Sequence, residues 1–160
     1  MSNSLSVYYL PVISFTANEF DQVALIGGGS GMYESSSFYI FPILIWISSS
    51  TPLYQFLDHA LSDPSNRTKF TLVYANVSPS DILLRKELDT LQKEHPKTFD
   101  IVYIVDKPVE GWTGPTGHIN KDLIKKHVAS KDLGEKVKVF VCGKPNFDWV
   151  GDDRLISIYL

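Results

Sequence analysis

The stretch Val23–Gly31, Val-Ala-Leu-Ile-Gly-Gly-Gly-Ser-Gly, constrains the fold of this chain more than any other. Four apolar residues followed by glycines and a serine are typical of a buried strand that ends in a turn, where bare backbone can approach a ligand closely. In α/β sheets such a turn normally leads into a helix whose N–H groups face an anion. The stretch therefore predicts a phosphate site with a nucleotide pyrophosphate as its ligand, and an ordinary tight turn is the alternative.

The expected helix does not follow these glycines directly. The first plausible helix start is Thr51-Pro52, where Thr51 would cap the helix and Pro52 would take its first position. The intervening segment 32–50 has no charge apart from Glu34 and no period typical of a helix or strand. We therefore predict that an atypical insertion interrupts the nucleotide-binding unit.

Beyond this segment, apolar runs alternate with amphipathic stretches. Expected strands are 23–26, 70–75, 99–105 and 137–141, with a short final strand at 155–160; expected helices are 52–61, 80–93 and 120–128, the last two capped by Ser80 and Asn120. Alternation of strands and helices at this spacing is typical of an α/β fold with a doubly wound parallel sheet.

Composition narrows the classes of function. A chain of 160 residues with 44% apolar content is long enough for one domain with a core. The net charge of -3 and the absence of a basic patch argue against nucleic acid, and the single cysteine excludes an internal disulfide. The apolar run Phe38–Ile47 contains Pro42 and is shorter than the roughly 20 residues of a membrane span. No lysine or arginine precedes Arg67, which argues against a targeting segment at 1–17.

A parallel sheet places its ligand at the carboxyl ends of the strands. The residues expected there are Gly27–Gly31, Asn76, Asp106, Cys142 and Gly143. A dehydrogenase fingerprint is not met, because Asn76 rather than an acid ends the second strand. Taken alone, Cys142 could be a small buried apolar residue and Asp106 a solvated turn residue. Trp112, among glycines and prolines, is expected to pin a loop.

Several motifs together resemble a known family. They are Val23–Gly31, Thr51–Gln55, Tyr74–Asn76, Asp81–Arg85, Val105–Pro108, Gly111–Gly117 and Val141–Gly143. In order and spacing they look like the NADH-binding domain of the NADH-cytochrome b5 reductases of the fungal mitochondrial type, within the ferredoxin-NADP reductase superfamily.

The resemblance implies a ferredoxin reductase-like NAD-binding domain over residues 18–143, truncated and interrupted by 32–50. Residues 1–17 stay unassigned, and 144–160 form an atypical tail. In such an enzyme hydride passes from NADH to FAD and electrons continue to a cytochrome b5-like haem protein. The family's FAD-binding barrel is not recognisable here, so we expect the chain alone to be inactive. A non-catalytic nucleotide-binding or structural remnant is the alternative. The family also implies a mitochondrial location, at the outer membrane or in the intermembrane space.

The resemblance also assigns residues. Around the pyrophosphate it places Gly28, Gly29, Ser30, Gly31, Thr51 and Pro52. Asp106 would lie near the adenosine ribose, where a carboxylate favours NADH over NADPH. Cys142 and Gly143 would flank the nicotinamide, where the hydride leaves. No metal site is expected.

Overall fold

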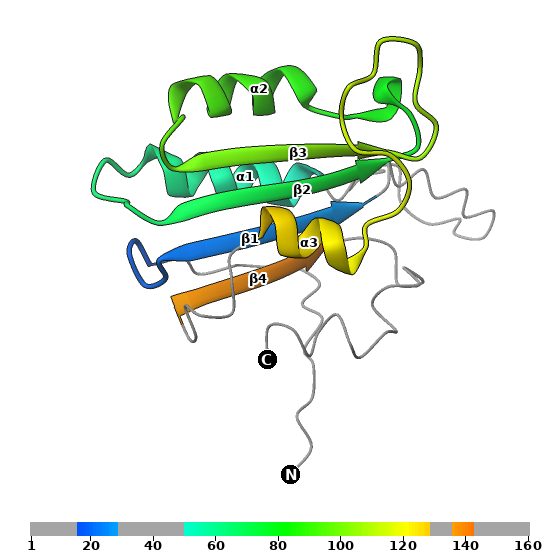
Figure 1. Cartoon of the computed structure of the whole chain (residues 1–160). Coiled ribbons are helices and arrows are strands. Elements are labelled where there is room, and N and C mark those ends of the chain that lie inside the picture. Colours follow the sequence, from blue (N-terminus) through cyan, green and yellow to red (C-terminus); the bar gives the residue numbers. More distant parts are fainter. Residues whose placement is uncertain (1–15, 29–49, 129–135, 143–160) are drawn as a thin grey trace, which may run out of the picture.

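The computed structural model describes residues 16–28, 50–128 and 136–142 of the chain (Figure 1). Four strands form one sheet in the order β3-β2-β1-β4, and each neighbouring pair is parallel. Their bounds are β1 Gln22–Gly28, β2 Lys69–Asn76, β3 Phe99–Val105 and β4 Val137–Cys142. The predicted parallel sheet is confirmed, and the predicted strand 155–160 and segment 32–49 lie outside the described residues.

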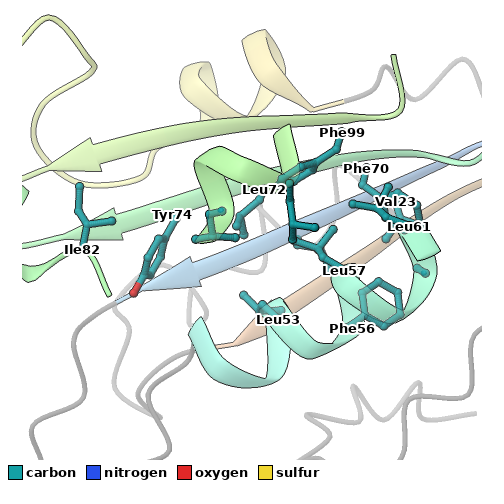
Figure 2. Close-up of a cluster of buried hydrophobic side chains, with 14 of the residues drawn as sticks. Val23, Leu53, Phe56, Leu57, Leu61, Phe70, Leu72, Tyr74, Ile82 and Phe99 are labelled. Carbon is teal, nitrogen blue, oxygen red and sulfur yellow. The ribbon is translucent and has the colours of Figure 1, made fainter. Parts of the chain in front are cut away.

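Helices cover both faces of the sheet, as a doubly wound fold requires (Figure 1). The helices are α1 Ser50–Ser62, the short 3-10 helix η1 Pro79–Asp81, α2 Arg85–Glu94 and α3 Lys121–His127. Helices α1 and α2 pack on one face, where Leu57 and Phe70 lie in a large apolar cluster (Figure 2). Helix α3 packs on the other face through Ile124.

The central strand β1 shows why its sequence is a continuous apolar run. Val23 and Leu25 belong to the cluster beneath α1 and α2, whereas Ala24 and Ile26 belong to the cluster beneath α3. Successive side chains of a strand point to opposite faces, so a strand covered on both faces needs apolar residues at every position. Strand β1 is thereby packed between two layers up to the glycines at its carboxyl end.

Helix α1 begins at Ser50, before the predicted start, so the prediction that Thr51 caps the helix is wrong. The backbone of Thr51 and Pro52 is already helical. Proline is tolerated there because the first four N–H groups of a helix have no acceptor within it.

The predicted helix 80–93 is two elements, η1 and α2, so the prediction that Ser80 caps one continuous helix is wrong. The Asp81 carboxylate accepts hydrogen bonds from the backbone N–H and the hydroxyl of Ser78 at 2.9 and 2.6 Å. Leu84 then adopts a left-handed conformation with φ of 55°, which ends any helical path. Helix α2 starts anew when the N–H of Leu88 donates to the carbonyl of Leu84.

The predicted cap of α3 is confirmed. The side-chain oxygen of Asn120 accepts hydrogen bonds from the N–H groups of Asp122 and Leu123 at 3.1 and 2.9 Å. These bonds satisfy N–H groups that have no acceptor inside the helix. The cap thereby fixes where the long loop after β3 ends.

Candidate functional site at the carboxyl edge of the sheet

The strand order places a topological switch between β1 and β4. The chain runs outward from β1 through β2 to β3, and then crosses back to place β4 on the other side of β1. In open parallel sheets ligands bind in the crevice at such a switch, outside the carboxyl ends of the strands. Gly27 on β1 is in register with Cys142 on β4, so the predicted residues Gly28 and Cys142 end neighbouring strands at this point.

Gly27 has a structural role of its own, whereas the sequence predicted only one common role for Gly27–Gly31. A Cβ atom at this position would lie 2.8 Å from Cδ1 of Leu53 and 3.4 Å from Cδ2 of Tyr74. Figure 2 shows both side chains close to the carboxyl end of β1. The glycine therefore allows α1 and β2 to close over the strand end, a contact that a larger residue would prevent.

The same contact fixes where α1 begins. Because Leu53 in the first turn touches Gly27, the N-terminal turn of α1 lies at the carboxyl edge. The backbone of Thr51 and Pro52 thus comes close to the end of β1, and their placement around a pyrophosphate stays a prediction. An N-terminal helix turn carries partial positive charge and N–H groups without acceptors, which suit an anion.

Asp106 is the first residue after β3. Its backbone N–H donates to the carbonyl of Asn76 at 3.1 Å, and the next N–H, of Lys107, donates to the carbonyl of Val77 at 2.7 Å. The backbone around Asp106 is thus fixed against the end of β2. Its carboxylate is exposed and forms no hydrogen bond or ion pair with any described residue.

These positions are spread along the edge rather than gathered at one point. Neighbouring strands lie about 4.8 Å apart, so the end of β3 is about 10 Å from that of β1 and about 14 Å from that of β4. Asp106 and Cys142 therefore suit the two halves of an elongated ligand. Gly29, Ser30, Gly31 and Gly143 lie outside the described residues, and the structure describes only the backbone of Thr51, Pro52 and Cys142.

Asn76 ends β2, between these two groups of residues. It is 6% exposed, and neither its side-chain oxygen nor its side-chain nitrogen has a hydrogen-bond partner among the described residues. A buried amide normally has partners, because leaving it without them costs about 1–3 kcal/mol. The sequence predicted that Asn76 lies at the end of a strand. It could not predict that the Asn76 side-chain amide lacks hydrogen-bond partners, because that depends on tertiary contacts.

A groove of about 320 Å³ lies elsewhere, between α1 and α2. Tyr54 and Asp58 line it from α1, and Lys86, Glu87 and Glu94 from α2. Burial, and then the nearby carboxylates of Asp58, Glu87 and Glu94, raise the pKa of Tyr54. None of these residues follows a strand, so the groove is separate from the predicted site.

The described residues contain neither a candidate metal cluster nor a helix that could span a membrane. Within 16–28, 50–128 and 136–142, no group of three or more histidine, cysteine, aspartate or glutamate side chains could hold a metal ion. In the same part of the chain, no helix has the length and apolar character needed to cross a membrane.

Known proteins resemble the chain in sequence and in fold. The sequence model of the oxidoreductase NAD-binding domain matches residues 48–148. NADH-cytochrome b5 reductase 2 of Mycosarcoma maydis is 39% identical over 132 residues, which are 82% of this chain and 32% of that protein. The protein of the same name from Aspergillus terreus is 39% identical over 136 residues, covering 85% and 37%. The chain thus spans about a third of the length of these curated relatives.

Solved structures agree with these matches. The cytochrome b5 reductase domain of Ulva prolifera nitrate reductase superimposes with a TM-score of 0.69 at 29% identity, over 88% of this chain and 45% of that one. The CS-b5R domains of human Ncb5or, in an NAD+ form, share the fold with a TM-score of 0.61 at 24% identity, over 86% and 33%. The chain therefore belongs to the oxidoreductase NAD-binding domain family, and the part of the NADH-cytochrome b5 reductases that it resembles is their NAD-binding region.

Proposed function

We propose that this chain is the NADH-binding domain of a flavin-dependent NADH-cytochrome b5 reductase. The observation that carries the proposal is the carboxyl edge of the sheet, where β1 ends in glycine beside Cys142 and Asp106 stands two strands away. In the longer protein, FAD would accept the hydride and a cytochrome b5-like haem protein the electrons. The names of the curated relatives support this acceptor, and a mitochondrial location is part of the same proposal.

The described residues fit a dinucleotide. Its pyrophosphate would lie between Gly28, the last residue of β1, and the first turn of α1, which contains Thr51 and Pro52. Two strands away, Asp106 would accept hydrogen bonds from the adenosine ribose hydroxyls with a carboxylate that has no other described partner. NADH, when bound, supplies the hydride, and the backbone at Cys142 and Gly143 would hold the nicotinamide where that hydride leaves.

Isothermal titration calorimetry of the whole chain with NADH tests the proposal. We expect saturable binding of one NADH per chain, with NADPH binding more weakly. Absence of saturable NADH binding, under conditions where the chain is folded by circular dichroism, would overturn the proposal in favour of a structural remnant.

Electron transfer is tested separately with ferricyanide. Hydride must be divided into single electrons before a one-electron acceptor can take them, and FAD provides that chemistry. We therefore expect NADH-dependent ferricyanide reduction only in samples whose absorption spectrum contains flavin. Rapid reduction by a flavin-free sample would contradict this account of the electron path.

A further inference from the structure

The loop 107–118, between β3 and α3, is tied to the last residue of β3. The N–H of Val105 donates to the carbonyl of Pro115 at 3.3 Å, and the N–H of Gly117 donates to the carbonyl of Val105 at 2.9 Å. Thr116 forms a parallel bridge with the same valine. On its other side Val105 pairs with Asn76 of β2, so it is held from both edges and is fully buried.

Trp112 fixes the part of this loop around Gly114 and Pro115. Its indole N–H donates to the carbonyl of Pro115 at 3.2 Å, the same carbonyl that accepts the N–H of Val105. The ring packs against the large apolar cluster and covers Gly114 so closely that a Cβ atom there would lie 2.7 Å from the indole. The predicted role of Trp112 as a pin for the loop is confirmed.

The indole also lies near a charged network that includes Arg85 of α2. The guanidinium carbon of Arg85 lies 5.8 Å from the Trp112 ring centre and 5.4 Å from the Tyr103 ring centre. Arg85 Nε lies 3.9 Å from a carboxylate oxygen of Asp89, and the Tyr103 hydroxyl donates to the other at 2.7 Å. Burial, and then this hydrogen bond, raise the pKa of Tyr103. The network joins β3, α2 and the loop.

We infer that Trp112 is a positioning residue for the Asp106 carboxylate. Asp106 follows Val105 in the chain, and the N–H of Val105 and the indole N–H of Trp112 donate to the same carbonyl, that of Pro115. A hydrogen bond to a ribose hydroxyl forms only within a few tenths of an ångström of its best length. Loosening the loop therefore weakens the contact with NADH and also moves the charge that repels the 2′-phosphate of NADPH. The inference rests on the proposed function, in which Asp106 faces the adenosine ribose.

The test compares Trp112→Leu with the unaltered chain by calorimetric titration of NADH and of NADPH. Loss of one hydrogen bond to a charged group corresponds to about a tenfold change in affinity. We expect NADH to bind about tenfold more weakly and the preference for NADH over NADPH to fall by a similar factor. Retention of the preference would overturn the inference, even if both affinities fell.

Two gentler variants keep the test decisive if Trp112→Leu fails to fold. Gly114→Ala retains the tryptophan but pushes the indole away from its site, and should lower the NADH preference without removing apolar surface. Trp112→Phe keeps an aromatic ring but cannot donate to Pro115, so its NADH preference should fall between those of Trp112→Leu and the unaltered chain. Unchanged preference in both would also overturn the inference.

Phe56→Leu provides the matched control. Phe56 is an aromatic residue of the same apolar cluster, packed against Phe70 and Phe140 with ring centres 6.0 and 5.5 Å apart. It lies on α1 rather than on the loop, so this variant should lower the melting temperature without changing the NADH preference. An equal fall in preference for Phe56→Leu would reduce the effect of Trp112 to general destabilisation and overturn the inference.

A double-variant cycle separates this inference from the proposed function. In an Asp106→Ser background, Trp112→Leu should leave the NADH preference unchanged, because the carboxylate it positions is gone. A further fall in that background would show that Trp112 acts independently of Asp106 and overturn the inference. If Asp106→Ser by itself leaves the preference unchanged, the placement of the ribose in the proposed function is what fails.

Discussion

The two edges of the sheet differ in how completely their polar groups are satisfied. At the amino edge, the backbone of Asp21 links three strands: its N–H donates to the carbonyl of Lys136 and its carbonyl accepts from Lys69. Beside it, the side chain of Asn18 accepts from the N–H of Arg67 and donates to the carbonyl of Ser65, at 2.7 and 3.0 Å. These polar groups at the amino edge form hydrogen bonds with one another.

At the carboxyl edge, by contrast, the asparagine side chain lacks such partners. The amide of Asn76 and the carboxylate of Asp106 form no hydrogen bond with any described residue. Val77 and Val109, which flank them, are 45% and 59% exposed. The asparagine amides thus differ between the edges: that of Asn18 is bonded within the fold, whereas that of Asn76 is without a described partner at the edge where a parallel sheet binds its ligand.

The largest expected effect at the carboxyl edge is that of Asp106→Ser on cofactor choice. Two like charges about 4 Å apart in partly screened surroundings repel by several kcal/mol, and about 1.4 kcal/mol already gives tenfold discrimination. We expect the ratio of the NADPH to the NADH dissociation constant to fall by about tenfold or more. Calorimetric titration of both nucleotides measures this ratio.

Asp100→Ser is the control for that prediction. Asp100 lies on β3, the strand that Asp106 follows, and is also exposed, and its replacement by serine changes the net charge equally. Its carboxylate, however, already accepts hydrogen bonds from the Gln92 side chain and from the N–H of Ile101. Its replacement should leave the ratio unchanged. Equal effects of the two substitutions would mean that net charge alone sets the preference and that Asp106 is only a turn residue.

An intermediate effect is expected at the amino edge. Thr68 is 1% exposed, and its hydroxyl donates to the carbonyl of Phe20 at 2.7 Å. Thr68→Val keeps the shape of the side chain and leaves this carbonyl without its donor, so the free energy of unfolding should fall by about 1–2 kcal/mol. Urea denaturation measures it, and the NADH dissociation constant should not change.

Thr71→Val makes the same chemical change where no hydrogen bond is lost. Thr71 is half-buried on β2, and its hydroxyl has no hydrogen-bond partner among the described residues. Valine is at least as suitable as threonine in a strand, so stability should be unchanged or slightly higher. A loss equal to that of Thr68→Val would show that the hydrogen bond to Phe20 contributes nothing particular.

The strands of the sheet could be predicted from the sequence more completely than the surroundings of the individual side chains. Strand Phe99–Val105 and the Asn120 cap follow from local patterns, namely a β-branched run and a side chain that bonds to the next turn. The break at Leu84 was missed because the apolar stripe continues through it, whereas the bonds from Ser78 to Asp81 favour a turn.

Predictions for the site had a similar limit. Topology alone brings Gly28, Cys142 and Asp106 to one edge, because every strand is parallel and ends there. The unpaired amide of Asn76 and the tie from Trp112 through Pro115 to Val105 depend on which side chains meet across the fold, and no spacing in the sequence encodes that.

The smallest expected effect is that of Asn76→Ala at the carboxyl edge, and Asn66→Ala at the amino edge is its comparison. Asn66, at the amino edge, donates to the carbonyl of Ala60 and accepts from the N–H of Thr68, at 3.0 and 3.1 Å. Asn66→Ala breaks both bonds and should lower the free energy of unfolding by about 1–2 kcal/mol.

Asn76→Ala breaks no described hydrogen bond. It removes a buried amide without described partners, and this gain offsets the packing that is lost with the side chain. Its unfolding free energy should therefore stay within about 1 kcal/mol of the unaltered chain. Urea denaturation of the two variants side by side measures the difference, and a loss at Asn76 as large as that at Asn66 would show that the amide is already satisfied within the fold.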